Sequence, residues 1–146
     1  MIGSTRKVAP RRAEPHPRPS EARRWIVGAE GYGPSMEHIA LFDQEGHRWV
    51  AELPTRRRER MRGLLGRQGL SEDRALLLPR TRSVHTFGMR FPIEVAWLDH
   101  EWRVVEVRPV PPGRVALPRL RARHVLEFAS GGAPSLGARL RSAPMS

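Results

Sequence analysis

Hydrophobic positions are densest in residues 83–99, which read SVHTFGMRFPIEVAWLD. Side chains of a β-strand point to opposite faces in turn, so the second half divides into Ile93, Val95 and Trp97 on one face and Glu94, Ala96 and Leu98 on the other. Because both faces are largely apolar, the pattern predicts a strand that is covered on both sides. The run WRVVEVRPV at residues 102–110 predicts a second strand, joined to the first by a tight polar turn at residues 99–101.

Shorter hydrophobic runs predict further strands before and after this hairpin. HIALF at residues 38–42 and HRWVAEL at 47–53 flank the segment DQEG, whose length and composition are typical of a hairpin loop. ALLL at 75–78 and HVLEF at 124–128 predict two more buried strands, the second with Val125 and Glu127 on one face. The whole pattern favours a mainly β (α+β) domain, a compact antiparallel sheet or barrel-like fold with one short helix.

The predicted helix follows Pro54, with Thr55 as its N-cap and RRRERMRGLLGR behind it. Its apolar residues lie near its C-terminal end, so we expect a short helix that is held by the packing of Leu64 and Leu65. The same basic segment, residues 56–67, carries the densest positive charge of the chain: Arg56, Arg57, Arg58, Arg60, Arg62 and Arg67. It is either a solvated helix face or a face that binds an anionic ligand or nucleic acid.

The first half of the central stretch is less regular than the second. Gly88 predicts a bulge or a close backbone contact. His85, Thr86 and Arg90 lie among apolar residues there. They form either a hydrogen-bonded bend that satisfies its own backbone or a polar cluster that lines a pocket.

Composition and charge divide the chain of 146 residues into two parts. Residues 1–35 are rich in Pro and Arg and lack hydrophobic periodicity, so we expect a disordered arm followed by a single β-rich domain at 36–146. The net charge of +11 favours an anionic partner. No run is long and apolar enough to span a membrane, and no secretory signal is visible, so we expect a cytoplasmic protein.

Motifs for known catalytic chemistry are missing from the sequence. There is no cysteine, no GxSxG and no compact histidine spacing for a metal, so we assign no catalytic residue, no metal ligand and no cofactor. Arg90 and Glu127 each lie between apolar neighbours. Because an unpaired charge in a core is very costly, we expect these two residues to form a buried ion pair.

Three segments, RMRGLLGR at 60–67, residues 83–99 and VLEF at 125–128, together resemble the uncharacterised family called domain of unknown function number 192, in its actinobacterial type. The resemblance covers about residues 36–140 and implies a compact β-rich domain with no established activity. It implies that the recurrent polar positions of the family are Arg62, Arg67, Arg90, Asp99 and Glu127. A Gly-Asp pair that often occurs in a final strand of the family is replaced here by Ala138 and Arg139.

Three functional hypotheses follow, and the sequence leaves all three open. The first is a binding or accessory module for an anionic ligand, with candidate binding residues Arg62, Arg67, His85, Arg90, Asp99 and Glu127. The second is a small hydrolase that uses Asp99, Glu127 and His85 as acid and base. The third is a structural accessory of an envelope or secretion assembly. A pocket that holds His85 together with both carboxylates would favour the enzyme.

Overall fold

The structure, a computed structural model, describes residues 36–144 as nine strands and one short helix. The elements in chain order are β1 (Met36–Phe42), β2 (Arg48–Pro54), α1 (Arg57–Arg62), β3 (Arg74–Pro79), β4 (Val84–His85), β5 (Ile93–Leu98), β6 (Val104–Val110), β7 (Val115–Ala116), β8 (His124–Ala129) and β9 (Arg141–Pro144). The predicted strands at 38–42, 47–53, 75–78, 93–98, 102–110 and 124–128 are all present, within a few residues of the expected bounds.

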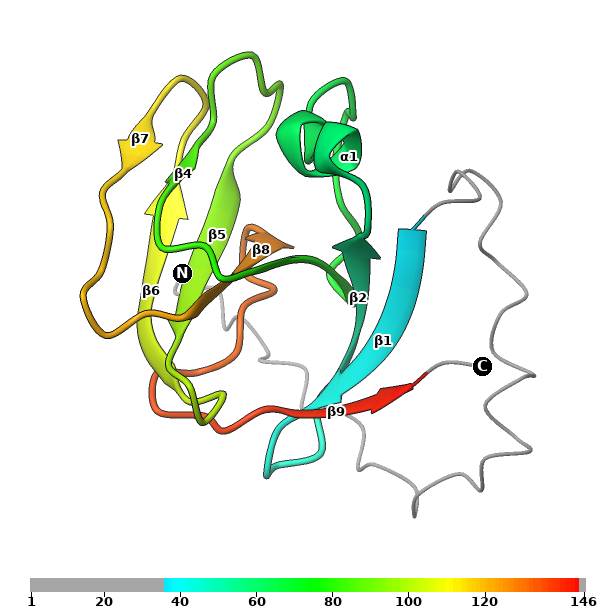
Figure 1. Cartoon of the computed structure of the whole chain (residues 1–146), viewed down its shortest axis with the longest axis vertical. Coiled ribbons are helices and arrows are strands. Elements are labelled where there is room, and N and C mark those ends of the chain that lie inside the picture. The colour runs from blue at the N-terminus through cyan, green and yellow to red at the C-terminus, as the bar shows by residue number, and fades with distance from the viewer. Residues whose placement is uncertain (1–35, 145–146) are drawn as a thin grey trace, which may run out of the picture.

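Seven of these strands form one sheet in the order β6-β5-β8-β3-β2-β1-β9. β2 and β3 are parallel, and every other neighbouring pair is antiparallel. Figure 1 shows that the sheet curls, with β5 and β6 on one side and β1 and β2 on the other. α1 lies in the connection from β2 to β3, because parallel strands cannot be joined by a tight hairpin. The predicted β-rich fold with one short helix is confirmed.

The sheet is apolar on both faces, and two groups of buried side chains result. On one face Leu98 of β5 packs with Phe128 of β8. On the other face Trp97 packs with Val125, and its indole Nε1 donates a hydrogen bond to the carbonyl oxygen of Arg82 at 2.8 Å. The predicted division of residues 93–98 into two covered faces is therefore confirmed.

The polar residues that begin the central stretch belong to a small second sheet, in which β4 pairs with β7. Thr86 is fully buried; its hydroxyl donates to the carbonyl oxygen of Pro111 at 2.7 Å and accepts from the backbone amide of Arg114 at 2.9 Å. Gly88 has a φ of 78°, which favours glycine, and its backbone lies against Leu65. This segment therefore contains the hydrogen-bonded bend that was one of its two interpretations.

The helix differs from the prediction at its beginning. Arg56, with φ −99° and ψ 146°, occupies the N-cap position that was expected for Thr55. Glu59 in the first turn accepts hydrogen bonds from the backbone amides of Thr55 and Arg56, both at 3.2 Å. The first-turn carboxylate thus bonds back to the backbone amide of the N-cap residue, Arg56, and to that of Thr55 before it. The helix ends at Gly63, and the Leu64 that follows is buried, as expected for a short helix held by packing.

The last segment of the described chain connects the two edges of the sheet. Near the start of β6, the backbone amide of Val104 donates to the carbonyl oxygen of Ala138, and that of Leu140 donates to Trp102. The chain then continues as β9, which pairs with β1 at the opposite edge (Figure 1). A final strand therefore forms although Ala138 and Arg139 replace the family's Gly-Asp pair.

The disordered arm predicted for residues 1–35 lies outside the described residues. Within residues 36–144, no helix has the length and apolar character required to cross a membrane.

Candidate functional site

A buried ion pair joins β2 to the segment after α1. Glu52 has no exposed surface, and its two oxygens accept hydrogen bonds from Nη1 and Nη2 of Arg67 at 3.1 and 2.6 Å. This is the forked arrangement in which guanidinium and carboxylate satisfy each other. The expected pair of Arg90 with Glu127 is wrong: Arg90 is exposed, and no ion pair joins the two among the described residues. Arg90 lies in a surface turn, where water solvates its charge.

Glu127 occupies an unusual environment in the middle of the sheet. It lies on β8 between Leu76 of β3 and Val95 of β5, and only 5% of its surface is exposed. Burial raises the pKa of Glu127 to about 7, against a weaker lowering by the nearby positive charge of Arg67. Among residues 36–144 its carboxyl group has no hydrogen-bond or ion-pair partner. Glu127 therefore exchanges a proton close to neutral pH.

A cavity of about 180 Å³ opens beside this carboxyl group, and we call it the Glu127 pocket. It lies between the end of α1, the end of β3, the segment around β4 and the middle of β8. Its lining combines polar and apolar groups: Arg60, Arg62, Gly63, Leu64, Leu65, Leu78, Thr81, Ser83, Val84, His85, Met89 and Glu127. A polar cluster lining a pocket, the second interpretation of the central stretch, thus applies to His85.

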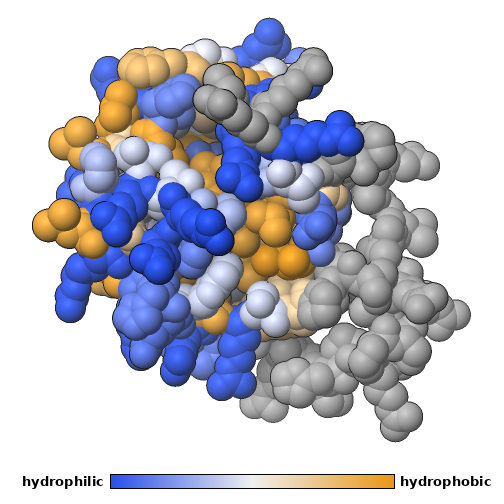
Figure 2. Space-filling model, in the orientation of Figure 1, coloured by the Kyte–Doolittle hydropathy of each residue, from blue (hydrophilic) through white to orange (hydrophobic). Residues whose placement is uncertain are grey.

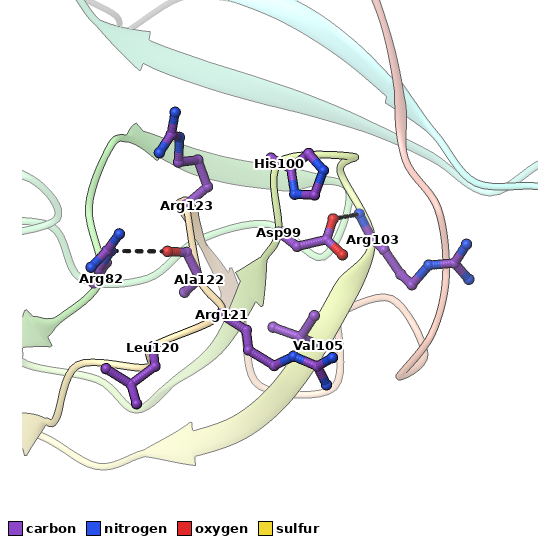
Figure 3. Close-up of a pocket in the computed structure, with 9 residues that line it drawn as sticks. All are labelled: Arg82, Asp99, His100, Arg103, Val105, Leu120, Arg121, Ala122 and Arg123. Atoms are coloured by element: carbon purple, nitrogen blue, oxygen red, sulfur yellow. Dashed lines mark hydrogen bonds between the residues drawn. The ribbon is translucent and has the colours of Figure 1, made fainter.

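A larger hollow of about 690 Å³ lies at the other end of β5 and β8, and four arginines dominate its lining. We call it the arginine hollow; its lining residues are Arg82, Asp99, His100, Arg103, Val105, Leu120, Arg121, Ala122 and Arg123. Figure 3 shows that the four guanidinium groups point in different directions around the hollow and do not converge on one point. Figure 2 shows hydrophilic residues gathered where Figure 1 places the β7–β8 connection and the β5–β6 turn.

The positive charge of the arginine hollow is not neutralised within the described part of the chain. None of its four arginines forms a salt bridge there. Arg119, by contrast, pairs with Glu106, and this contact lowers the pKa of that carboxyl group. Arg82 donates from Nε to the carbonyl oxygen of Ala122 at 3.1 Å, and the charge of Arg103 acts on Asp99 in the same hollow. With four arginines and one aspartate in its lining, the hollow keeps a net positive charge.

Two titratable groups beside these arginines, Asp99 and His124, have shifted pKa values. Burial alone would raise the pKa of Asp99, but hydrogen bonds from the backbone amides of Arg103 and Glu101 outweigh it and lower the pKa. The Asp99 carboxylate is thus used to hold its own turn, with Oδ1 accepting from these amides at 3.0 and 2.9 Å. Burial lowers the pKa of His124, and the charges of Arg123 and Arg80 lower it further.

One cluster of possible metal ligands exists among residues 36–144, in the β1–β2 loop. Ligand atoms of Asp43, Glu45 and His47 lie within 4.8 Å of one another. In the sequence these residues have the spacing D-x-E-x-H, which contains only one histidine and is no compact histidine motif. Asp43 accepts hydrogen bonds from the backbone amides of Glu45 and His47 at 3.0 and 2.8 Å, so the need to order a tight loop accounts for the cluster.

The structure separates the six candidate binding residues predicted from the sequence. Arg62, His85 and Glu127 line the Glu127 pocket, and Asp99 lines the arginine hollow. Arg67 is joined to Glu52, and Arg90 lines neither cavity. The set therefore does not form a single site.

The arginines of the hollow were missed as site residues. Two of them, Arg121 and Arg123, lie in the run RLRAR at 119–123, and Arg82 and Arg103 are distant from it in sequence. The feature of the sequence that could have indicated a basic site is the pair Arg121 and Arg123 just before a buried strand. What the sequence does not contain is the sheet order, which places β8 beside β5 and so brings the three segments together.

The family described as DUF192, "Uncharacterized ACR", matches residues 40–140. The chain belongs to this family, as its three-segment resemblance predicted. A UPF0127 protein of Pyrococcus horikoshii, PH1112, is 41% identical over 49 residues, which cover 34% of this chain and 43% of that relative. The aligned part thus spans less than half of the relative's length.

Two solved structures share the fold. One is a proposed transcription regulator of Sinorhizobium meliloti, with a TM-score of 0.61, 22% identity and coverage of 73% of this chain and 93% of that chain. The other is a protein of unknown function from Novosphingobium aromaticivorans, with a TM-score of 0.60, 18% identity and coverage of 83% and 96%. At these identities the likeness extends to the fold and not to function. The family is described as uncharacterised, so a function can be inferred only from the residues that line the two cavities.

Proposed function

We propose that this domain is a binding module for a small, multiply charged anion, which it holds in the arginine hollow. The observation that carries the proposal is a hollow lined by four arginines that have no carboxylate partner among the described residues. Guanidinium groups bind phosphate and carboxylate oxygens through paired hydrogen bonds. The volume, about 690 Å³, is within the range of roughly 300–1,000 Å³ that is usual for small-molecule sites.

The spread of the arginines indicates what kind of anion fits. Because the guanidinium groups do not converge, a ligand with two or more anionic groups uses them better than a single small ion (Figure 3). Leu120, which is 92% exposed, and Val105 offer apolar contact in the same hollow. A ligand that combines several oxyanion groups with a short carbon skeleton matches this lining.

The hydrolase hypothesis has less support. Its three residues do not share a cavity, since Asp99 lines the arginine hollow while His85 and Glu127 line the Glu127 pocket. Asp99 is also engaged with the backbone of its own turn. Groups that act on one substrate must all reach it, and this arrangement separates Asp99 from the other two.

Nucleic acid is the alternative polyanion, because a structural neighbour is described as a proposed transcription regulator. A face that binds an anionic ligand or nucleic acid was one of the two interpretations of the basic segment at 56–67. Arg67 of that segment is held by Glu52, which leaves fewer of its charges for phosphate groups. A hollow favours a small ligand over a duplex, so nucleic acid becomes one outcome of the test.

Calorimetric titration with pyrophosphate and with citrate tests the proposal. We expect both to bind, and Arg121→Ala with Arg123→Ala to weaken binding roughly tenfold or more, since each hydrogen bond to a charged group contributes about 1.5–3 kcal/mol. The matched control is Arg48→Ala with Arg141→Ala, which removes the same charge from exposed positions outside the hollow and leaves affinity within about twofold.

Equal losses in the two double variants would mean that net charge alone attracts the anion, and the proposed site would be wrong. If instead a single- or double-stranded oligonucleotide binds and both small anions do not, the domain is a nucleic-acid binder. That interaction should weaken steeply with added salt, because phosphate contacts release counterions.

A further inference from the structure

The Glu127 pocket contains a buried carboxyl group that the fold does not use. Only 5% of the surface of Glu127 is exposed. The residue lines the cavity and has no hydrogen-bond partner among residues 36–144. Glu52 lies on β2, on the far side of β3 from β8, and is a structural carboxylate. It accepts two hydrogen bonds from Arg67, which satisfy its charge. Glu127 is therefore placed to receive a hydrogen bond from a molecule in the pocket.

The charge around the pocket limits what that molecule can carry. Arg62 belongs to the lining, and Arg67 is close enough to Glu127 to act on its charge. These positive groups, together with Arg60, which also lines the pocket, disfavour an ammonium group as the partner of Glu127. A hydroxyl group suits the position, because it can donate to the carboxylate and can also accept from the protonated acid.

The remaining lining defines the other features of the ligand. Arg62, at the end of α1, is exposed and can pair with an anionic group at the entrance. Leu64, Val84 and Met89 are buried apolar side chains of the wall, which suit a short hydrocarbon skeleton. A cavity of about 180 Å³ admits only a small molecule.

We propose that the Glu127 pocket is a second binding site, separate from the arginine hollow, for a small hydroxy acid. The hydroxyl group of the ligand donates to the Glu127 carboxylate inside the pocket, its carboxylate pairs with Arg62 at the entrance, and its hydrocarbon part contacts the apolar wall. This site does not depend on the function proposed for the arginine hollow, since the two cavities share no lining residue.

A set of three ligands tests each part of this proposal: 3-hydroxybutyrate, butyrate, which lacks the hydroxyl group, and 1,3-butanediol, which replaces the carboxylate with an alcohol. Amide NMR spectra of the full chain, titrated with each, report the affinity and the place of binding. We expect 3-hydroxybutyrate to shift the amides of His85, Met89 and Glu127. Each of the other two should bind roughly tenfold more weakly, the loss typical of one hydrogen bond to a charged group.

Two variants complete the design. Arg62→Ala should weaken 3-hydroxybutyrate about tenfold and leave 1,3-butanediol unchanged. Arg90→Ala, the matched control, removes an exposed arginine that lies outside the pocket and should change neither ligand. The proposal is overturned if no ligand shifts the pocket amides, or if butyrate binds as well as 3-hydroxybutyrate. Shifts confined to Arg103, Arg121 and Arg123 would also overturn it and would support the arginine hollow instead.

Discussion

At the scale of single residues, Glu127 and Glu52 show two fates of a buried carboxyl group in one sheet. Both side chains are buried because their positions in the strands direct them into the interior, although each carries an ionisable group. The Glu52 carboxylate accepts two hydrogen bonds from the guanidinium group of Arg67, whereas Glu127 has only the charge of Arg67 nearby and no hydrogen bond from it. The difference is that burial dominates at Glu127, so its proton is retained up to about neutral pH.

Glu127 should make the stability of the domain depend on pH. Its pKa is raised from 4.5 to about 7, so the folded state holds a proton that the unfolded state has released. The resulting stabilisation is complete below about pH 4.5 and is lost as the pH rises to about 7, a change of about 3 kcal/mol at 1.36 kcal/mol per unit. Denaturant melts across this range should show the slope, and Glu127→Gln should remove it.

The matched control is Glu37→Gln, at an exposed position of β1, which should keep the profile of the unmodified protein. Asp99 and Glu106, whose pKa values are lowered, act in the opposite sense, and the stability they contribute is lost only as the pH falls towards acid. A Glu127→Gln profile parallel to that of the unmodified protein would contradict the assignment.

The Glu52–Arg67 pair should be costly to break from one side. Arg67→Met leaves Glu52 buried and unpaired, which should reduce the free energy of unfolding by about 3–5 kcal/mol. Adding Glu52→Leu should recover much of this loss, because the uncompensated charge is gone. Denaturant melts measure both. Arg62→Met, at an exposed position five residues away in the same basic segment, is the control and should change little.

A double variant whose cost equals the sum of the two single costs would show that the residues do not interact. The sequence indicated that a buried arginine–carboxylate pair exists but named the wrong partners. The partner of a buried side chain depends on which elements are neighbours in the fold. Arg67 lies in the connection between the parallel strands β2 and β3, and the sequence alone does not show that this connection brings it to Glu52 of β2.

At the scale of the elements, hydrophobic alternation predicted the strands well because most of them are covered on at least one face. β5 and β8 were predicted down to the division of their faces. The two-residue strands β4 and β7 carry no such pattern, since two residues cannot show a period. The start of α1 differs for another reason: Glu59 accepts from the backbone amides of Thr55 and Arg56, which makes Arg56 the N-cap in place of Thr55.

The small β4–β7 sheet should depend on one hydroxyl group. Thr86→Val keeps the shape of the side chain but leaves the amide of Arg114 and the carbonyl group of Pro111 without their buried partner. We expect a loss of about 1–3 kcal/mol in thermal or denaturant unfolding. Thr81→Val is the control: Thr81 is only partly buried, and its change should stay within about 0.5 kcal/mol. Equal effects of both changes would mean that the Thr86 contacts contribute nothing special.

At the scale of the whole molecule, the described sheet uses residues from 36 onwards, and the family match begins at residue 40. We therefore expect a chain of residues 36–146 to melt at the same temperature as the full chain. Circular dichroism melts of the two proteins side by side measure this. A drop of several degrees for the shorter chain would show that residues 1–35 pack on the domain.

The sequence did not predict which of the candidate residues line the same cavity. Asp99, Glu127 and His85 were grouped because each is a polar residue in or near a predicted strand. The sheet order places Asp99 at one end of β5 and His85 near the other, so the strand itself separates them. Local patterns fix the direction in which a side chain points, but the distance between two sites is set by the topology.

The segment that joins the two sheet edges also has a consequence for how the protein is made. Of the described strands, β1 is synthesised first and β9 last. β1 therefore leaves the ribosome long before β9, its partner on the side away from β2, exists. Until residues 137–144 appear, the edge of β1 and the start of β6 both present unpaired backbone groups, which are templates for pairing with other nascent chains. Closure of this sheet is therefore a late event of biosynthesis, and chains that stop before residue 137 are the ones most exposed to aggregation.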